Sequence, residues 1–275
     1  MQASYQNQHL NTTATRVFSQ ATADFFIKRL SAGVAVALHS KDFARGTYKE
    51  VALNVTYAQY LRLMDGNLSI IPSLQLHMEH SALDLNALHY GDHITWFTVW
   101  TNPAMVPSAR NRSLSYNGGL LLNYKDRFYA GISGFHLNEP AAGFLPGYKY
   151  PMLLKYHASY NQKLGEKHLA QLVYRHHRQY TMWANQLSAN FLFSNRMMGG
   201  AGISFYENNS YRNKSKHTLL LLNIGVRFQN WAFNLSGDID DRAVNAYFLG
   251  SVSAHVSINI NKTRVDAALA TFEGF

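Results

Sequence analysis

Apolar and polar side chains alternate with a period of two along most of this chain, and no other feature constrains its fold as strongly. In residues 251–260 every even-numbered residue is apolar and every odd-numbered residue is polar. Residues 113–123 and 218–228 show the same period. Because successive side chains of a β-strand point to opposite faces, each of these segments separates an apolar environment from a polar one.

The composition favours membrane-spanning strands over both soluble and helical alternatives. Charged residues make up 15% of the chain, below the roughly 25% of ordinary soluble domains, and aromatic residues make up 13%. The longest apolar runs, such as 34–38 and 219–222, are far shorter than the roughly 18 residues that indicate a membrane helix. The sequence therefore excludes a helical membrane protein.

The alternation and the turn residues between its segments predict an all-β protein: an antiparallel, up-and-down transmembrane β-barrel. Several strands have the roughly 9–11 residues with which a tilted strand crosses a bilayer. The thirteen predicted strands cover residues 17–27, 30–40, 47–62, 67–79, 113–124, 127–137, 148–162, 168–178, 182–194, 200–207, 216–228, 231–238 and 248–260.

Short connections tend to alternate with longer ones, as in outer-membrane barrels with short periplasmic turns and longer outer loops. Tight turns are expected at 28–29, 65–66, 125–126, 164–165 and 229–230, and longer segments at 41–46, 80–112, 138–149, 207–215 and 239–247. The short connection at 179–181 is an exception. Tyr124, Phe128 and Trp231 flank tight turns, which is typical of the aromatic girdles at membrane interfaces. A soluble sandwich capped by these rings is the alternative interpretation.

Bacterial single-chain barrels have even strand numbers, so thirteen strands imply a missing one. An open seam between 17–27 and 248–260 would expose unpaired backbone groups to lipid. We therefore expect a barrel of 14 strands whose first strand precedes residue 1. Residues 1–260 would form a single outer-membrane barrel domain, and residues 261–275 a periplasmic tail. Residues 1–10 are polar and lack the pattern of a secretory signal peptide.

The titratable residues give no positive support for catalysis, so we expect no enzyme, no cofactor and no metal. The chain has no cysteine, and its 25 basic residues are scattered, which argues against nucleic-acid binding. A zinc site at His89, Asp92 and His93 and a loose calcium site in 237–241 are weaker interpretations than ordinary polar turns. Ser253 and His255 share a strand face, but no hydrolase motif accompanies them.

Segments in a fixed order along the chain carry a family resemblance. Residues 82–94 contain Leu-Asp and then Gly-Asp, residues 129–140 contain His-Leu before a proline, and residues 248–258 place a glycine before a strand. With Leu145-Pro146 and Gln186-Leu187, this order resembles the PorP/SprF family of outer-membrane proteins, associated in Bacteroidota with type IX secretion and gliding motility. The family's Asn-Pro-Ala start is missing from residues 1–16. The matching signature positions are Leu85, Gly91, Asp92, His136, Leu137, Pro140, Pro146, Gln186 and Gly250.

The resemblance implies a structural and docking component of the secretion or gliding machinery in the outer membrane of a Gram-negative bacterium. Its implied partners are outer-membrane lipid, periplasmic secretion-system components and a large secreted surface adhesin. The alternative function is an outer-membrane channel or transporter for a small solute. Arg175, Arg227 and His255 would then point into the lumen and form a lining that favours anions.

Overall fold

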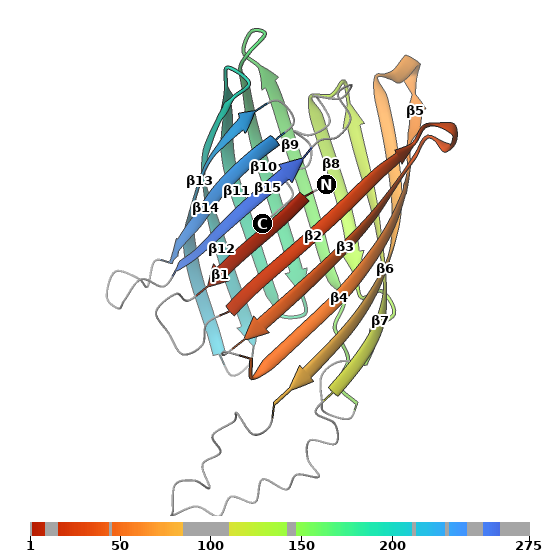
Figure 1. Cartoon of the computed structure of the whole chain (residues 1–275), viewed down its shortest axis with the longest axis vertical. Coiled ribbons are helices and arrows are strands. Elements are labelled where there is room, and N and C mark those ends of the chain that lie inside the picture. The colour runs from red at the N-terminus through yellow and green to blue at the C-terminus, as the bar shows by residue number, and fades with distance from the viewer. Residues whose placement is uncertain are drawn as a thin grey trace, which may run out of the picture.

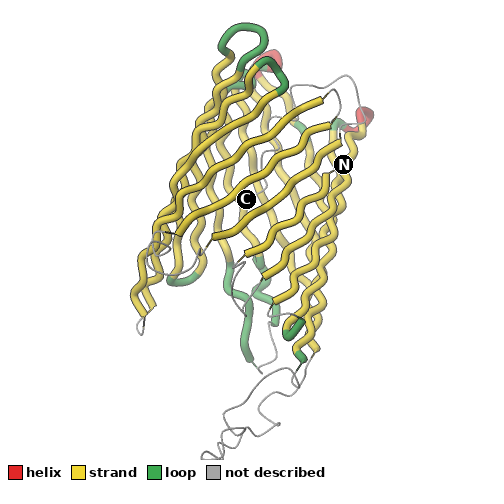
Figure 2. Tube along the Cα trace, turned by 60° about the vertical axis from the view of Figure 1, so that its left-hand side comes forward, coloured by secondary structure: helices red, strands yellow, loops and turns green. Residues whose placement is uncertain are grey.

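The computed structural model shows a closed, antiparallel β-barrel (Figures 1 and 2). It describes residues 2–8, 16–43, 46–84, 110–141, 147–210, 213–228, 231–240 and 250–258. The strands are β1 (Gln2–Gln8), β2 (Arg16–Ile27), β3 (Ala32–Phe43), β4 (Tyr48–Gln59), β5 (Leu61–Leu63), β6 (Leu68–Leu83), β7 (Arg110–Tyr124), β8 (Phe128–Phe135), β9 (Leu153–Lys163), β10 (Leu169–Gln179), β11 (Met182–Phe193), β12 (Met197–Ser210), β13 (Asn213–Phe228), β14 (Trp231–Asp240) and β15 (Gly250–Ile258). Two short 3₁₀ helices, η1 (Lys28–Leu30) and η2 (Met64–Gly66), lie in turns. Within the described ranges, no helix is long and apolar enough to span a membrane.

Strands β4 and β5 form one position in the barrel wall. Both pair with β6 in a single register, in which Ala58 lies opposite Ser73 and Leu61 lies opposite Ile70. The interruption falls beside Pro72 of β6, which has no N–H to donate to the ladder. Since β1 pairs with β15, the sheet of fifteen strands closes into a barrel of 14 wall positions. The predicted fold and strand number are confirmed.

The strand expected before residue 1 is instead β1, so that part of the prediction is wrong. β1 pairs with β2 on one side and with β15 on the other. Its lumen side carries Gln2, Ser4 and Gln6, while its outer side has Ala3 and Tyr5 as its apolar residues. This strand is short and mostly polar, so its alternation of polar and apolar residues is too weak to predict a strand. Its place between β2 and β15 identifies it as the strand that closes the wall.

The thirteen predicted strands all form. β9 begins at Leu153 rather than at residue 148, because residues 148–152 belong to the connection that follows β8. The tight turns gather at the end of the barrel that is uppermost in Figure 1, which we call the tight rim; the opposite end is the loop rim. Asp65, Lys125 and Asp126 have φ values of 54°, 52° and 53°, the positive values that tight hairpins require. The turn after β10 is the expected short exception at the loop rim.

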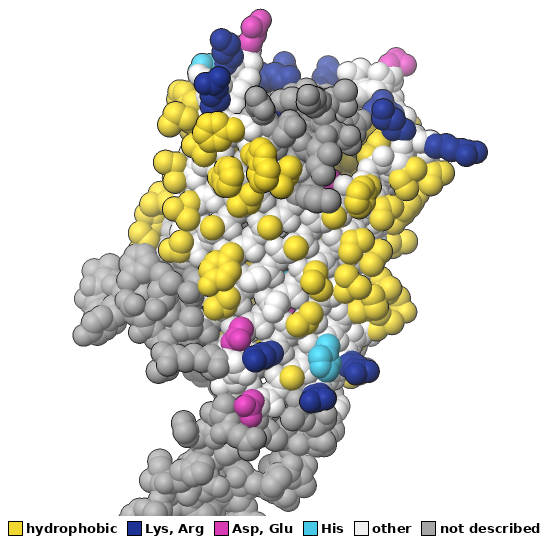
Figure 3. Space-filling model, viewed as in Figure 1, with side chains coloured by type: hydrophobic (Ala, Val, Ile, Leu, Met, Phe, Trp, Pro, Cys, Tyr) yellow, Lys and Arg dark blue, Asp and Glu magenta, His cyan; other side chains and the backbone are white. Residues whose placement is uncertain are grey.

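The two faces of the wall have opposite polarity. Leu187, Phe191 and Phe193 of β11 are exposed on the outer face, whereas Ser115 and Asn117 of β7 are buried on the inner face. Figure 3 shows apolar side chains over the middle of the barrel and charged side chains towards its ends. A soluble sandwich would bury its apolar faces against each other, so that alternative is excluded. The barrel lies in lipid, and the protein belongs to the outer membrane of a Gram-negative bacterium.

A glycine on the inner face allows close packing of β13 and β14. A Cβ added at Gly225 would lie 2.5 Å from the carbonyl oxygen of Phe233, whereas one at Gly199 would lie 4.0 Å from its nearest neighbour, the carbonyl oxygen of Asn223. We expect Gly225→Ala to lower the free energy of unfolding by about 1 kcal/mol, because backbone must move to admit the methyl group. Gly199→Ala is the matched control and should not destabilise. Equal effects in urea titrations of the two variants would contradict this packing.

Candidate functional site

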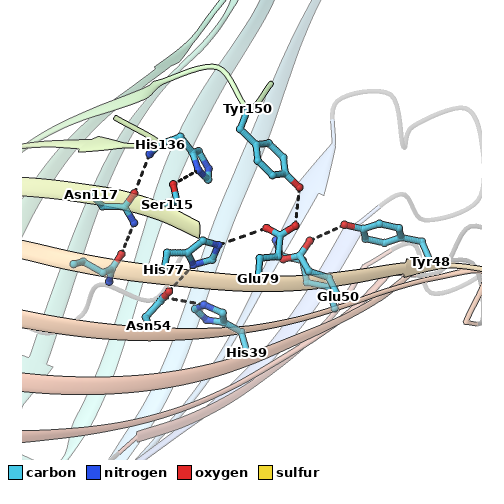
Figure 4. Close-up of polar contacts among 12 residues, drawn as sticks. His39, Tyr48, Glu50, Asn54, His77, Glu79, Ser115, Asn117, His136 and Tyr150 are labelled. Carbon is cyan, nitrogen blue, oxygen red and sulfur yellow. Dashed lines mark hydrogen bonds and ion pairs between the residues drawn. The ribbon is translucent and has the colours of Figure 1, made fainter. Parts of the chain in front are cut away.

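A connected set of polar side chains lines the inner wall of β3, β4, β6 and β7 near the loop rim (Figure 4). We call it the mouth network. Eight of its members come from strands, and two come from the connection between β8 and β9. Its members are His39, Tyr48, Glu50, Asn54, His77, Glu79, Ser115, Asn117, His136 and Tyr150.

Strand register places the network on the lumen side. Asn54 lies opposite His77, and His77 lies opposite Ser115 on the next strand. Directly opposed residues of antiparallel strands point to the same side of the sheet. Asn54 and Ser115 are buried, while the adjacent Val55 and Leu114 are exposed to the outside. The network therefore faces the lumen.

A chain of hydrogen bonds runs along the inner face of the wall from β3, through β4, to β6. Asn54 Nδ2 lies 2.8 Å from His39 Nε2, and Asn54 Oδ1 lies 2.5 Å from His77 Nδ1. With this orientation the amide donates to His39 and accepts from His77, which fixes the tautomer of each ring. His77 Nε2 lies 3.5 Å from Glu79 Oε2, so a protonated His77 also pairs with that carboxylate.

Two buried carboxylates lie at the loop-rim end of the network. Glu50 and Glu79 are 6% and 7% exposed. Glu50 accepts hydrogen bonds from Lys41 Nζ at 2.6 Å and from the Tyr48 hydroxyl at 2.9 Å. Glu79 accepts one from the Tyr150 hydroxyl at 2.8 Å. A buried carboxylate is costly unless donors satisfy it, so these contacts hold both side chains in place.

The described parts of the connection between β8 and β9, residues 136–141 and 147–152, contact the inner wall; we call these two stretches the latch segment. The backbone N–H of His136 donates to Asn117 Oδ1 at 2.9 Å, and His136 Nδ1 lies 2.8 Å from Ser115 Oγ. Tyr150 reaches Glu79 from the other end, and its ring stacks on that of His136 with centroids 4.9 Å apart. The positive φ of His136, 56°, lets the chain leave β8 and turn into the barrel.

Asn138 of the latch segment continues the pairing of β7 where β8 has already ended. Its Oδ1 accepts from the N–H of Tyr116 at 3.1 Å, and its Nδ2 donates to the carbonyl of Leu114 at 2.9 Å. The N–H of Leu137 donates to the Tyr116 carbonyl at 2.9 Å. A side-chain amide thus replaces strand backbone at an edge that would otherwise lack partners.

Burial shifts the titration of the two latch-segment groups. It lowers the pKa of His136 from its usual value, and the positive charge available on His77 lowers it further. Burial also raises the pKa of the Tyr150 hydroxyl, with the Glu79 carboxylate adding to the effect. Both groups are therefore neutral at pH 7, as their stacking and hydrogen bonds require.

Acidification is expected to loosen the latch segment. Because the pKa of His136 is lower in the folded protein than the 6.5 of a free side chain, its contribution to stability is complete above pH 6.5 and declines as the pH falls below it. Amide hydrogen exchange at Leu137 and Tyr150, corrected for intrinsic rates, should show easier opening at pH 5 than at pH 7.5. His136→Asn, which tolerates positive φ, should lose most of this pH dependence. An unchanged dependence in that variant would rule out His136 as its source.

The predicted signature residues do not form one site. Leu85, Gly91, Asp92 and Pro146 lie outside the described residues, as do the proposed zinc ligands and the 261–275 tail. His136 belongs to the mouth network, Leu137 is half-exposed, and the carbonyl of Pro140 accepts from the Tyr150 N–H at 2.9 Å. Gln186 lies on the lumen face of β11, and Gly250 begins β15. The described part of the chain holds no group of three or more His, Asp or Glu side chains that could bind a metal ion.

The predicted lumen lining is borne out by register. Arg175 lies opposite Gln186, Arg227 opposite Ala232, and His255 opposite Asn234, which is buried on the inner face. Ser253 shares that face, but its hydroxyl pairs with Ser236 Oγ at 2.5 Å, while His255 Nε2 lies 2.5 Å from Gln2 Nε2.

The mouth network was not predicted from the sequence, although the sequence does show polar residues along one face of two of its strands. Glu50, Asn54 and Thr56 occupy even positions of β4, and His77 and Glu79 occupy odd positions of β6, so polar residues fall on one face of each strand. Which strands neighbour each other at the loop rim follows from the barrel order. The inward turn of the latch segment has no sequence signal.

Comparisons with known proteins show the fold. No protein-family model and no curated protein matches the chain. Among solved structures, the CymD monoaromatic hydrocarbon channel has a TM-score of 0.55 at 10% identity, covering 95% of this chain and 88% of that one. The Pseudomonas putida toluene transporter TodX has 0.53 at 10% identity, covering 93% and 87%. The Acinetobacter baumannii outer membrane protein Omp33 has 0.52 at 8% identity, covering 94% and 95%.

These findings correct the family assignment. Membership of the PorP/SprF family is wrong, because no family model matches and the structures of similar fold are an outer-membrane protein, a hydrocarbon channel and a toluene transporter. The docking role in type IX secretion or gliding rested on that resemblance alone and falls with it. The periplasmic and adhesin partners have no other support, while contact with membrane lipid follows from the barrel itself.

Proposed function

We propose that the protein is an outer-membrane channel for a small polar or charged solute. The observation that carries this is the polarity of the closed wall: the described strands turn hydrogen-bonding side chains inwards and apolar ones to lipid. A lumen lined by polar groups is what a water-filled path requires. The solved channels of similar fold support this function and agree with the expectation that the protein is not an enzyme.

The lumen carries both signs of charge. Arg175 and Arg227 face inwards, as the anion-favouring lining required, but Glu50 and Glu79 face inwards as well. Lys41 offsets the charge of Glu50, and Glu79 lies 3.5 Å from His77 Nε2. Arginine remains charged at any physiological pH. We infer a preference for anions, set by these cations.

Planar-bilayer recording tests the channel directly. The purified protein should give discrete conductance steps and should conduct anions better than cations. Heat-denatured protein should give no conductance. Gln186→Trp places a large side chain in the lumen and should lower the conductance by about twofold or more. Leu187→Trp, one residue away on the lipid face, should leave it unchanged. A silent wild-type protein, or equal effects of the two variants, would overturn the proposal.

A further inference from the structure

A cavity of about 460 Å³ lies beside the mouth network, at the loop-rim ends of β2, β3 and β4. Arg16 lies opposite Phe43, and Phe18 lies opposite Lys41, so these four side chains share the lumen face. Tyr48, opposite Phe43 on β4, joins them. The volume is within the roughly 300–1,000 Å³ that is typical of small-molecule sites. The cavity is therefore large enough for a ligand and opens on the proposed solute path.

Two cations border this cavity. Lys41 pairs with Glu50 at 2.6 Å, yet its side chain remains 51% exposed, so it keeps donors that reach solvent. Arg16 is exposed, with its guanidinium carbon 4.9 Å from the centre of the Phe43 ring. Asp42 also borders the cavity, but it alternates with Lys41 and Phe43 along β3, so its carboxylate lies on the other face, where it accepts the Gly46 N–H at 2.6 Å. Since Glu50 offsets Lys41, Arg16 supplies the charge that attracts an anion.

Three aromatic rings also line the cavity. The Arg16 guanidinium lies over the Phe43 ring, a cation–π contact that places the cation beside an aromatic surface. The Phe18 ring has its centre 6.1 Å from that of His39, so the cavity adjoins the mouth network. Tyr48 is held by its hydrogen bond to Glu50 at 2.9 Å. Rings fixed in this way offer faces and edges to a planar ligand.

We propose that this cavity binds a small aromatic carboxylate as it enters the channel. Arg16, with Lys41 beside it, pairs with the carboxylate, while Phe18, Phe43 and Tyr48 contact the ring. A purely apolar solute would leave the arginine without an anion, and a small inorganic anion would leave the aromatic lining uncovered. The inference rests on the proposed channel and names its solute class.

Binding to the full chain in detergent micelles tests this inference, with isothermal titration calorimetry and benzoate as the probe. Benzoate should bind. Acetate, which lacks the aromatic ring, and benzyl alcohol, which lacks the carboxylate, should each bind at least about tenfold more weakly. Arg16→Gln should weaken benzoate binding at least about tenfold. Lys163→Gln removes one positive charge at the end of β9, on the tight rim, and is the matched control; its affinity should equal that of the wild type.

The result that would overturn the inference is benzoate binding no tighter than acetate or benzyl alcohol, or binding unaffected by Arg16→Gln. If that variant does not fold, the wild-type protein still decides the matter. Benzoate should then reduce its conductance in a saturable manner at concentrations where acetate does not, and a lack of saturation counts against the site.

The two proposals fail in different ways. Conductance without benzoate binding would leave the channel standing and remove the aromatic-acid site. Benzoate binding in micelles without conductance would remove the channel and leave a binding site at the barrel mouth.

Discussion

Leu222→Arg is expected to lower the free energy of unfolding in lipid vesicles by about 2–4 kcal/mol, because it places a charge at the lipid-facing middle of a strand. Leu222 is 48% exposed on the outer face of β13, which runs from Asn213 to Phe228. The arginine would have to leave its charge in hydrocarbon or bend towards a distant interface. Urea titration followed by tryptophan fluorescence measures the loss.

The neighbouring residue provides the control. Leu221 lies on the lumen face of the same strand, opposite Asp238 of β14. Leu221→Arg therefore adds the same side chain on the polar side, within reach of a carboxylate, and should cost less than about 1 kcal/mol. Comparable losses in the two variants would show that the faces of β13 are not divided between lipid and lumen as described.

Breaking the contact between Tyr150 and Glu79 should release the C-terminal end of the latch segment. The Tyr150 hydroxyl donates to a buried carboxylate at 2.8 Å, and a hydrogen bond to a charged group contributes roughly 1.5–3 kcal/mol. Tyr150→Phe should lower the opening free energy at the Tyr150 position by that amount. Hydrogen exchange of its backbone N–H, which donates to the Pro140 carbonyl, measures the opening. In bilayers the variant should show noisier current as the segment moves.

A double-mutant cycle assigns the effect to this pair. Tyr150→Phe and Glu79→Ala should be non-additive by most of the single-variant loss, because either change removes the same hydrogen bond. Tyr57→Phe is the matched control: its hydroxyl contacts Gln59 Oε1 on an exposed face, away from the latch segment. Additive effects would mean that the two side chains stabilise the segment independently.

Local patterning accounts for the parts of the fold that the sequence predicts well. β13 and β15 alternate so regularly that their register and lipid face follow from the residues themselves. The turn at Lys125 and Asp126 was predictable for the same reason, since the strands on both sides point to it. The sequence analysis did not predict β1, because polar residues dominate this strand. The family resemblance was wrong, because it rested on the order of short motifs, each of which carries little information.

The sequence alone determined an outer-membrane barrel with a polar interior, because a period of two in the side chains is a local property that survives in any correct arrangement of the strands. Only the tertiary structure showed that β1 completes the wall and that the chain turns inwards after β8. Glu79 and Tyr150 are 71 residues apart, and their contact requires the pairing of β6, β7 and β8 and the return of the chain onto the inner wall after β8. The pairing of β2, β3 and β4 sets Arg16 and Tyr48 beside Phe43 and so forms the cavity at the mouth.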